Sequence, residues 1–294
     1  MVYLRRFSLP SESAETRVIM GEGRTCFSTF YPFGIFPDKG LRELRFDAVT
    51  MLYGTNGSGK STLLNAIAET TGAVRYAEFN DAPFFRAYTD LCYAEYARRP
   101  KEICVLTSDD VFDYVLRARV VNGRIDNERD ALFEKYVQVH AEAINDPSIG
   151  RLKGLDDYER WSEVREILSP RRTQSAYVKK RVARDVDLYS NGETAMRYFL
   201  DRIDGEGVYL LDEPENSLSI ALQIELASYI EATARTTGAQ FIIATHSPVL
   251  LSMRGARIYD LDTRGVPVSD WTELANVRRY FDFFMERKAE FCKE

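Results

Sequence analysis

The chain has 294 residues, enough for one large or two small domains with a substantial core. Its 45% hydrophobic and 29% charged residues are ordinary for a folded protein, and no apolar run approaches the ~20 residues that a membrane-spanning helix needs. The first residues lack the long apolar stretch of a signal peptide, so we expect a cytoplasmic protein without a membrane partner. The 4 cysteines are scattered and contain no C-x-x-C pair, which excludes the usual zinc and disulfide patterns. The net charge of −6 neither supports nor excludes a nucleic-acid partner.

A glycine-rich segment lies between a predicted strand at 48–53 and a predicted helix whose apolar side chains fall within 63–68. The segment consists of Gly54, Thr55, Asn56, Gly57, Ser58, Gly59, Lys60, Ser61 and Thr62. It fits the G-x-x-x-x-G-K-[ST] spacing of a phosphate-binding loop, in which backbone N–H groups and a helix N-terminus surround phosphate oxygens. Lys60 would reach the β- and γ-phosphates, and the Ser61 hydroxyl would hold Mg²⁺. A chance glycine–serine turn is the alternative, but the flanking strand and helix favour the phosphate loop.

A second apolar run, 208–211, ends in two carboxylates. The pattern is typical of a strand buried in a parallel sheet. Asp212 at the strand end would complete the oxygen ligands of Mg²⁺, and Glu213 would orient and deprotonate the attacking water. An acidic turn after a core strand is the alternative, and the phosphate loop elsewhere in the chain makes it less attractive.

A third apolar run, 240–245, is followed by His246, one of only 2 histidines. Ligands of open α/β sheets collect where the strands end, so His246 would hydrogen-bond the γ-phosphate and the water. His140 lies in a helical pattern and is interpreted as a half-buried or surface residue.

Ser190 and Glu193 fit the S-x-x-E capping box of a helix start, with Gly192 between them. One interpretation is a helix cap and nothing more. The other is an anion-binding helix N-terminus that is offered to a second nucleotide.

These segments, in this order, resemble those of the ATP-binding cassette (ABC) ATPases, and most of all the soluble SMC, RecF and OLD-like branch. The opening of the chain and the segment 258–262 also look like those of small stand-alone bacterial AAA-family ATPases. The resemblance implies ATP and Mg²⁺ as ligands, ATP hydrolysis, and a head-to-head homodimer in which each signature loop closes over the partner's nucleotide. It assigns Lys60, Ser61, Asp212, Glu213 and His246 to one side of each site, and Ser190, Gly192 and Glu193 to the side supplied by the other copy.

The pattern departs from the family in two places. Only Gln138 and Gln174 lie between the phosphate loop and the signature, so the glutamine that usually contacts Mg²⁺ has no evident equivalent. Ser219 stands where transporters carry an aspartate. Tyr31 and Phe33 precede the first strand and are interpreted either as core residues or as an adenine-stacking pair.

The predicted fold class is α/β: a phosphate-loop NTPase of ABC type with a mostly parallel sheet flanked by helices and an N-terminal antiparallel β layer. We expect a single ATPase head over 1–294, into which a compact helical lobe is inserted at 72–188. The lobe is too short and lacks the sustained heptads of a long coiled coil. It is predicted to contain a strand near 102–107, a helix from Ser108, and two more helices at 127–144 and 156–168, with a hinge at 150–154.

A basic stretch approaches the signature loop. It is interpreted either as a solvated helix face or as a contact for nucleic-acid phosphates. A C-terminal helix at 273–290 is predicted to pack back on the core, with docking of a partner as the alternative. The basic residues are Arg171, Arg172, Lys179, Lys180, Arg181 and Arg184.

Three functions fit such an ATPase. The first is a regulatory ATPase in nucleic-acid maintenance or antiviral defence against mobile DNA, acting through a separate effector protein. The second is the nucleotide-binding subunit of a membrane transporter, which the missing glutamine and the altered signature disfavour. The third is a scaffold that ATP clamps, with incidental turnover.

Overall fold

The computed structural model describes residues 1–23, 26–27, 29–76, 82–146, 148–149, 151, 158–169, 173–182 and 191–291. The chain divides into two units, which are described separately: unit 1 is Met1–Asp113 with Tyr189–Glu294, and unit 2 is Tyr114–Leu188. Residues 72–113, which the sequence analysis places in the inserted lobe, belong to unit 1 in the structure.

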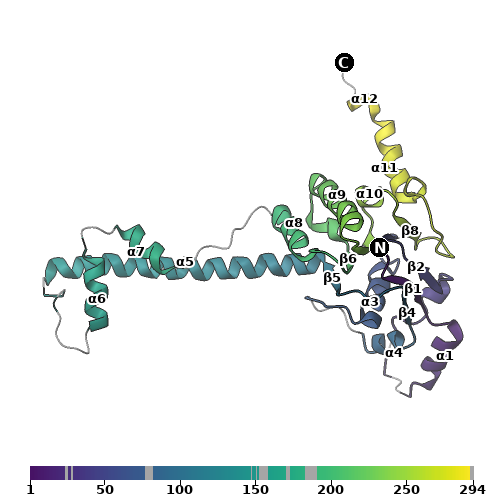
Figure 1. The fold of residues 1–294 in the computed structure, drawn as a ribbon, viewed down its shortest axis with the longest axis horizontal. Coiled ribbons are helices and arrows are strands. Elements are labelled where there is room, and N and C mark those ends of the chain that lie inside the picture. Colours follow the sequence, from purple (N-terminus) through teal and green to yellow (C-terminus); the bar gives the residue numbers. More distant parts are fainter. Residues whose placement is uncertain are drawn as a thin grey trace. The chain divides into compact units, whose positions relative to one another are not determined.

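Unit 1 contains a five-stranded parallel sheet with the order β5-β6-β7-β3-β8 (Figure 1). Every residue of β3 and β7 is buried, which explains why these strands read as continuous apolar runs. The strand at 102–107 predicted for the lobe is β5, which forms one edge of this sheet. The strands are β3 (Val49–Tyr53), β5 (Ile103–Thr107), β6 (Val208–Asp212), β7 (Gln240–Thr245) and β8 (Arg257–Asp260). The predicted α/β fold class is confirmed.

A second, antiparallel sheet has the order β2-β1-β4, formed by β1 (Leu4–Ser8), β2 (Glu43–Arg45) and β4 (Tyr93–Tyr96). The fully buried side chain of Gln240, in β7, joins the two sheets. Its Oε1 accepts hydrogen bonds from the backbone N–H groups of Tyr3 (2.9 Å) and Leu4 (2.8 Å), and its Nε2 donates to Leu4 O (2.8 Å) and Asp47 O (3.1 Å). All the bonding groups of this buried amide are used, so it fixes the N-terminal β layer against the parallel sheet.

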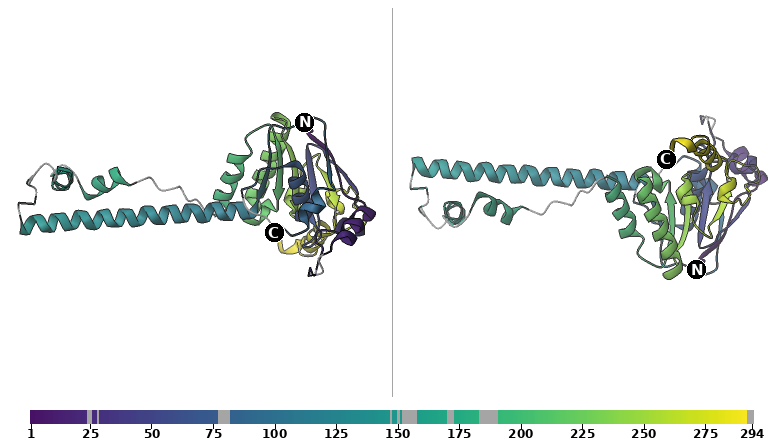
Figure 2. Two further views of the ribbon diagram at one scale, coloured as in Figure 1. Left: turned by 90° about the horizontal axis from the view of Figure 1, so that it is seen from below. Right: turned by 90° about the horizontal axis from the view of Figure 1, so that it is seen from above.

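Helix α3 (Lys60–Thr71) contacts β5, β6 and β7 of the parallel sheet and β4 of the antiparallel one. Helices α8 and α9 cover the other face of the parallel sheet, as the two views of Figure 2 show. None of the described helices is both long and apolar enough to cross a membrane. The remaining helices of unit 1 are α1 (Glu12–Gly21), α2 (Ile35–Asp38), α4 (Phe85–Thr89), α8 (Asn191–Arg202), η2 (Pro214–Ser217), α9 (Ile220–Thr236), α10 (Pro248–Leu251), η3 (Trp271–Glu273), α11 (Ala275–Glu286) and α12 (Lys288–Phe291).

Unit 2 is built on one long helix rather than on the two helices expected between Ser108 and 144. Helix α5 (Ser108–Asn145) runs without interruption for 38 residues, and α6 (Tyr158–Ile167) and α7 (Gln174–Arg181) pack near its C-terminal end. Their small core contains Val139, Val164, Ile167, Tyr177 and Val178. The prediction of separate helices was wrong, whereas the helix at 156–168 corresponds to α6. Of the expected hinge at 150–154, only residue 151 lies within the described residues.

The apolar face of α11 does not pack back on the core as the sequence predicts. Val277, near its start, is buried, but Tyr280, Phe281, Phe284 and Met285 have exposed fractions between 49% and 54%. The helix is amphipathic, and beyond its first turn the apolar stripe extends past the surface that would bury it.

Substitutions on this stripe should therefore cost little stability. We expect Phe281→Ala combined with Phe284→Ala to change the free energy of unfolding by less than ~1 kcal/mol, because half-exposed side chains leave no sealed cavity. Phe199→Ala serves as the buried control, because Phe199 on α8 is 0% exposed and its loss should cost about 3–5 kcal/mol. Urea unfolding of the three proteins makes the comparison, and a double variant as unstable as the control would contradict the exposed position of α11.

Candidate functional site

The glycine-rich segment forms a tight loop between the end of β3 and the start of α3. Gly57 and Gly59 have φ angles of 80° and 93°, in the left-handed region that glycine adopts without strain. At Gly54 a Cβ atom would lie 2.3 Å from Ser58 Oγ, so any side chain there would displace the loop. Gly59 precedes α3 directly, and the unpaired N–H groups of the first helical turn therefore face the inside of the loop.

Asp262, which follows β8, holds the first turn of this loop. The backbone N–H of Thr55 donates to both oxygens of the Asp262 carboxylate, at 3.0 and 2.9 Å, and the Thr55 hydroxyl donates to Oδ1 at 3.0 Å. Sequence reasoning missed this role. The available signal was the position of Asp262 two residues beyond a strand that pairs in parallel with β3.

Lys60 is the first residue of α3 and is only 3% exposed. Its Nζ donates hydrogen bonds to Gly54 O (2.8 Å) and Thr55 O (3.2 Å), both in the loop. The same Nζ lies 3.4 Å from Oε1 of Glu213. The ammonium group thus lies between the phosphate loop and the carboxylate at the end of β6.

Ser61 and Asp212 supply the oxygen donors of a candidate Mg²⁺ site. The Ser61 hydroxyl donates to Oδ1 of Asp212 at 3.0 Å. Burial raises the pKa of Asp212 to about 6, and the nearby Glu213 charge adds to the rise, while the Ser61 hydrogen bond and Lys60 oppose it. Burial disfavours the charged form of Asp212, and the Ser61 hydroxyl oxygen lies next to it. These two oxygen ligands fit a hard divalent cation, whose positive charge would stabilise the ionised carboxylate.

Glu213 adopts a left-handed backbone conformation, with φ 46° and ψ 52°. This conformation is unfavourable for a residue with a Cβ, by about 1 kcal/mol or more. It is held by the Glu213 N–H, which donates to Ala244 O at 2.8 Å, and by Pro214, which begins η2. On the side chain, Oε2 accepts from Asn216 Nδ2 at 3.0 Å, while Oε1 faces Lys60.

His246 follows β7 and lies beside two carboxylates. Its Nδ1 is 3.8 Å from Glu213 Oε1 and 3.3 Å from Glu215 Oε1. Glu215 itself is 6% exposed and accepts a hydrogen bond from the backbone N–H of His246 at 2.8 Å. The sequence analysis assigned no role to Glu215, because nothing in the local pattern shows that it reaches the end of another strand.

The predicted signature segment is described only in part. Ser190 lies outside the described residues, while α8 begins at Asn191 and Glu193 lies exposed in its first turn. At Gly192 a Cβ atom would meet Leu222 Cδ1 at 2.9 Å and Ser217 O at 3.6 Å. A side chain at position 192 would therefore have to displace the tip of Leu222 on α9.

The other candidates divide between core and surface. Phe33 is buried in the main core, and the Tyr31 hydroxyl lies 2.7 Å from Thr62 Oγ1 at the start of α3. His140 is half-buried, and its Nε2 lies 3.1 Å from Ile167 O, which is a structural contact in unit 2. Gln138 bonds Glu142 on the surface of α5, so it shows no link to the phosphate loop.

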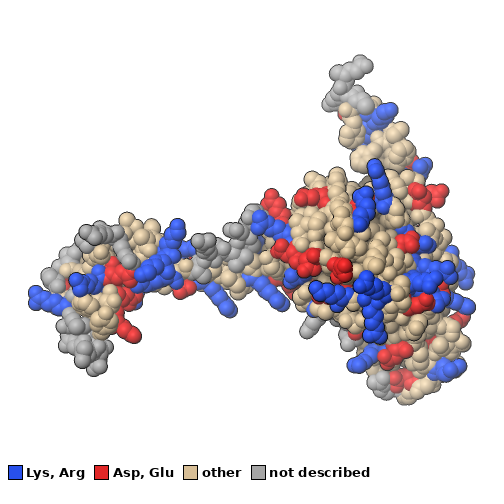
Figure 3. Space-filling model, in the orientation of Figure 1, with Lys and Arg blue, Asp and Glu red and all other residues tan. Residues whose placement is uncertain are grey.

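The basic stretch is largely paired where it is described. Arg181 and Lys180 of α7 form ion pairs with Glu166 of α6, at 2.6 and 3.2 Å. Figure 3 shows acidic side chains beside the basic ones on unit 2. Lys179 is exposed, while Arg171, Arg172 and Arg184 lie outside the described residues.

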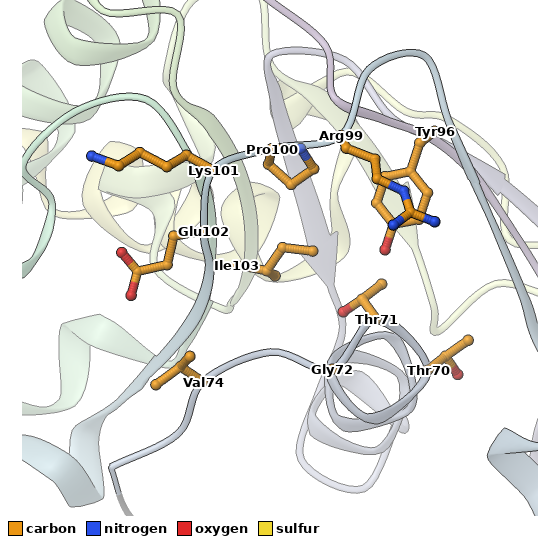
Figure 4. Close-up of a pocket in the computed structure, with 10 residues that line it drawn as sticks. All are labelled: Thr70, Thr71, Gly72, Val74, Tyr96, Arg99, Pro100, Lys101, Glu102 and Ile103. Atoms are coloured by element: carbon orange, nitrogen blue, oxygen red, sulfur yellow. The ribbon is translucent and has the colours of Figure 1, made fainter.

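A hollow of about 490 Å³ lies at the opposite end of α3 from the phosphate loop. Figure 4 shows it between the C-terminal end of α3, near Thr71 and Gly72, and the segment that carries Arg99 and Lys101. Both basic residues are exposed, and the hollow shares no lining residue with the loop.

The raised pKa of Asp212 predicts a stability gain on neutralising it. Burial raises the pKa of Asp212 from 3.8 to about 6. The contribution of this carboxyl group to the free energy of unfolding is therefore fully present below pH ~3.8, and it is lost as pH rises through ~6. Without metal and nucleotide, Asp212→Asn should therefore be more stable than the wild type by ~2–3 kcal/mol at pH 7.5, and equally stable near pH 4. Denaturant unfolding at both pH values measures the difference, and exposed Asp201→Asn is the control. Equal stability of wild type and Asp212→Asn at pH 7.5 would show that burial does not disfavour this charge.

Comparison with known proteins gives one family match. Residues 114–252 match the family model described as "AAA domain, putative AbiEii toxin, Type IV TA system". The match begins within α5 and ends just after α10, so it contains Asp212, Glu213 and His246 but not the phosphate loop. No curated protein matches the sequence.

Among solved structures, the chain is similar to the Smc head domain of Pyrococcus furiosus, solved with an extended coiled coil and bound to the C-terminal domain of ScpA. The two share 14% sequence identity over 98% of this chain and 100% of the other, with a TM-score of 0.41. The fold itself rests on the sheet order and loop geometry described above. The family match, the phosphate loop and the carboxylates at the end of β6 together make the chain similar to small ATPases of the AAA/ABC-like type.

Proposed function

We propose that the protein binds ATP with Mg²⁺ and hydrolyses it in a head-to-head dimer of two copies. The observation that carries this proposal is the convergence of Lys60, Glu213 and His246 beside the phosphate loop. A cation, a carboxylate and an imidazole at one strand edge are the groups that phosphoryl transfer to water uses.

Binding would begin with the phosphates in the loop. The N–H groups at the start of α3 would surround the β- and γ-phosphates, and Lys60 would exchange part of its contact with Gly54 O and Thr55 O for phosphate oxygens. When bound to Ser61 and Asp212, Mg²⁺ would neutralise charge that develops on the phosphates.

Hydrolysis requires a base for the attacking water. Glu213 would accept the proton from that water, while Asn216 donates a hydrogen bond to its Oε2. His246, whose Nδ1 lies 3.8 Å from Glu213 Oε1, would hydrogen-bond the γ-phosphate and the water. Before nucleotide binds, the Lys60 ammonium lies 3.4 Å from Oε1 of the same carboxylate and pairs with it. Transfer of Lys60 toward phosphate would release Glu213, so that the base becomes active only when the loop is occupied.

The dimer rests on the resemblance of the signature segment to that of ABC ATPases. Ser190, Gly192 and Glu193 would face the nucleotide of the other copy, since the start of a helix carries free N–H groups and a partial positive charge. Each copy alone would then have half of each site and hydrolyse slowly.

For the biological role, we favour a regulatory ATPase in defence against mobile DNA, gating a separate effector. Support comes from the description of the matched family, which names an AbiEii toxin and a type IV TA system. Direct binding of nucleic acid has weaker support, because Lys180 and Arg181 already pair with Glu166. No contact in the described residues favours the transporter-subunit or scaffold alternatives.

Lys60→Ala tests the nucleotide site. Loss of charged hydrogen bonds to phosphate, worth about 1.5–3 kcal/mol, should weaken ATP binding by roughly 10- to 100-fold. Isothermal titration with a non-hydrolysable ATP analogue and Mg²⁺ measures the affinity. Lys101→Ala, at the other end of α3, is the matched control and should bind like the wild type. Unchanged affinity in Lys60→Ala would refute the site.

Glu213→Gln tests the base and the dimer together. The variant should keep ATP affinity, remain dimeric with ATP and Mg²⁺, and lose ~10²–10⁴-fold in turnover, because the amide cannot accept the proton. Light scattering and phosphate release provide the two measurements, with exposed Glu206→Gln as control. Turnover at the wild-type rate would exclude Glu213 as base, and a monomer with bound ATP would exclude the dimer.

A further inference from the structure

We propose that Glu215 is a positioning residue that sets the place of His246 in the ATP site, an assignment that rests on the proposed function. Glu215 lies in η2, two residues beyond the base Glu213. Its side chain reaches the end of β7, where it accepts hydrogen bonds from Thr245 and from His246, the first residue after the strand.

One oxygen of the Glu215 carboxylate accepts hydrogen bonds from all three residues of the turn at 245–247. Oε1 accepts hydrogen bonds from the Thr245 hydroxyl (2.6 Å), the His246 N–H (2.8 Å) and the Ser247 N–H (3.2 Å). These donors belong to consecutive residues, so a single atom fixes both the backbone and the direction in which the His246 side chain leaves it. Hydrogen bonds to a charged acceptor are the stronger kind, and here they are buried.

The same oxygen also faces the imidazole ring. Oε1 lies 3.3 Å from Nδ1 of His246, and that nitrogen has no hydrogen-bond partner among the described residues. Glu213 Oε1, at 3.8 Å, is the other carboxylate oxygen near Nδ1. A carboxylate beside Nδ1 favours the tautomer that carries a proton there, which leaves Nε2 to act toward the nucleotide.

A purely structural role would leave much of Glu215 unexplained. The turn has other anchors, because the Ser247 hydroxyl donates to Gln223 Oε1 at 2.7 Å and caps α10 through the Leu250 N–H. Burying a carboxylate is costly, and its second oxygen, Oε2, has no hydrogen-bond partner among the described residues. An amide or a hydroxyl could accept the hydrogen bonds of the turn at a lower desolvation cost. The contact with Nδ1 of His246 is the one that a carboxylate serves better than these neutral groups do.

A double-mutant cycle in the full-length chain tests the assignment. His246→Ala should lower kcat by roughly 10²-fold, as expected for loss of a group that stabilises the transition state. Glu215→Ala should lower kcat by at least tenfold with ATP affinity within about twofold of the wild type, because the phosphate loop is intact. The double variant should be no slower than His246→Ala alone, because Glu215 then has no ring left to position.

Two further variants keep the test independent of folding. Thr245→Val removes one donor to Oε1 while keeping the side-chain volume, and should lower kcat several-fold with unchanged ATP affinity. Glu231→Gln is the control, because Glu231 also accepts a backbone N–H bond, from Arg254 at 2.8 Å, but lies on α9 away from His246. It should retain the wild-type kcat.

The outcomes separate the two levels of the proposal. A wild-type protein without ATP turnover overturns the proposed function and this assignment with it. A His246→Ala variant with the wild-type kcat overturns the role of His246 and this assignment, while ATP hydrolysis stands. If His246→Ala is slow, two results overturn the positioning role alone: a wild-type kcat in Glu215→Ala and Thr245→Val, or losses that multiply in the double variant. A Glu215→Ala protein that does not fold leaves Thr245→Val to decide, by its kcat at unchanged affinity.

Discussion

Parallel pairing of β6, β7 and β3 is the constraint on which the site depends. In this register Asp212 lies beside Ala244, and Tyr53 lies beside Thr245 and Asp260. The phosphate loop, the carboxylates after β6, the turn after β7 and the Asp262 segment after β8 therefore leave the sheet at one edge. Because side chains alternate along a strand, a slip of one residue in the pairing of β6 with β7 would turn Asp212 away from Ser61. Gln240 contributes at the opposite end of β7, where it fixes the N-terminal layer to the same strand.

The sequence predicts the elements whose chemistry is local. The buried strands, the phosphate loop and the start of α8 are each specified by a few neighbouring residues. The contacts of Glu215 and Asp262 depend on strand register, which local spacing does not contain. The sequence predicts two helices where the structure has the single helix α5. Asn122 and Gly123 form a pair that is typical of turns, yet they lie within this continuous helix. The amphipathic pattern of α11 specifies an apolar face but not whether a core lies beneath it.

Electrostatics at the strand edge favour an occupied site. Lys60 neutralises part of the acidic cluster through Glu213, yet Asp212 still has its pKa raised by burial and by the charge of Glu213. A bound cation would remove this penalty, and phosphates would take over the attraction of Lys60. Without a cation, the buried charge of Asp212 would thus lower the free energy of unfolding at neutral pH. Such a loss of stability at a preorganised site is common in proteins.

The short segment from Glu213 to Ser217 connects three parts of this site. It begins with the strained backbone of Glu213, continues with the Glu215 carboxylate that accepts hydrogen bonds from the His246 turn, and ends with Ser217, whose carbonyl oxygen lies close to Gly192 at the start of α8. There is little space at that last contact, since a single added methyl group at Gly192 would collide with Leu222. Interfaces packed this closely respond to a push by shifting as a unit rather than by deforming. A displacement of α8 would therefore be passed to η2, and through η2 to Glu213 and to the Glu215 contact with the His246 turn.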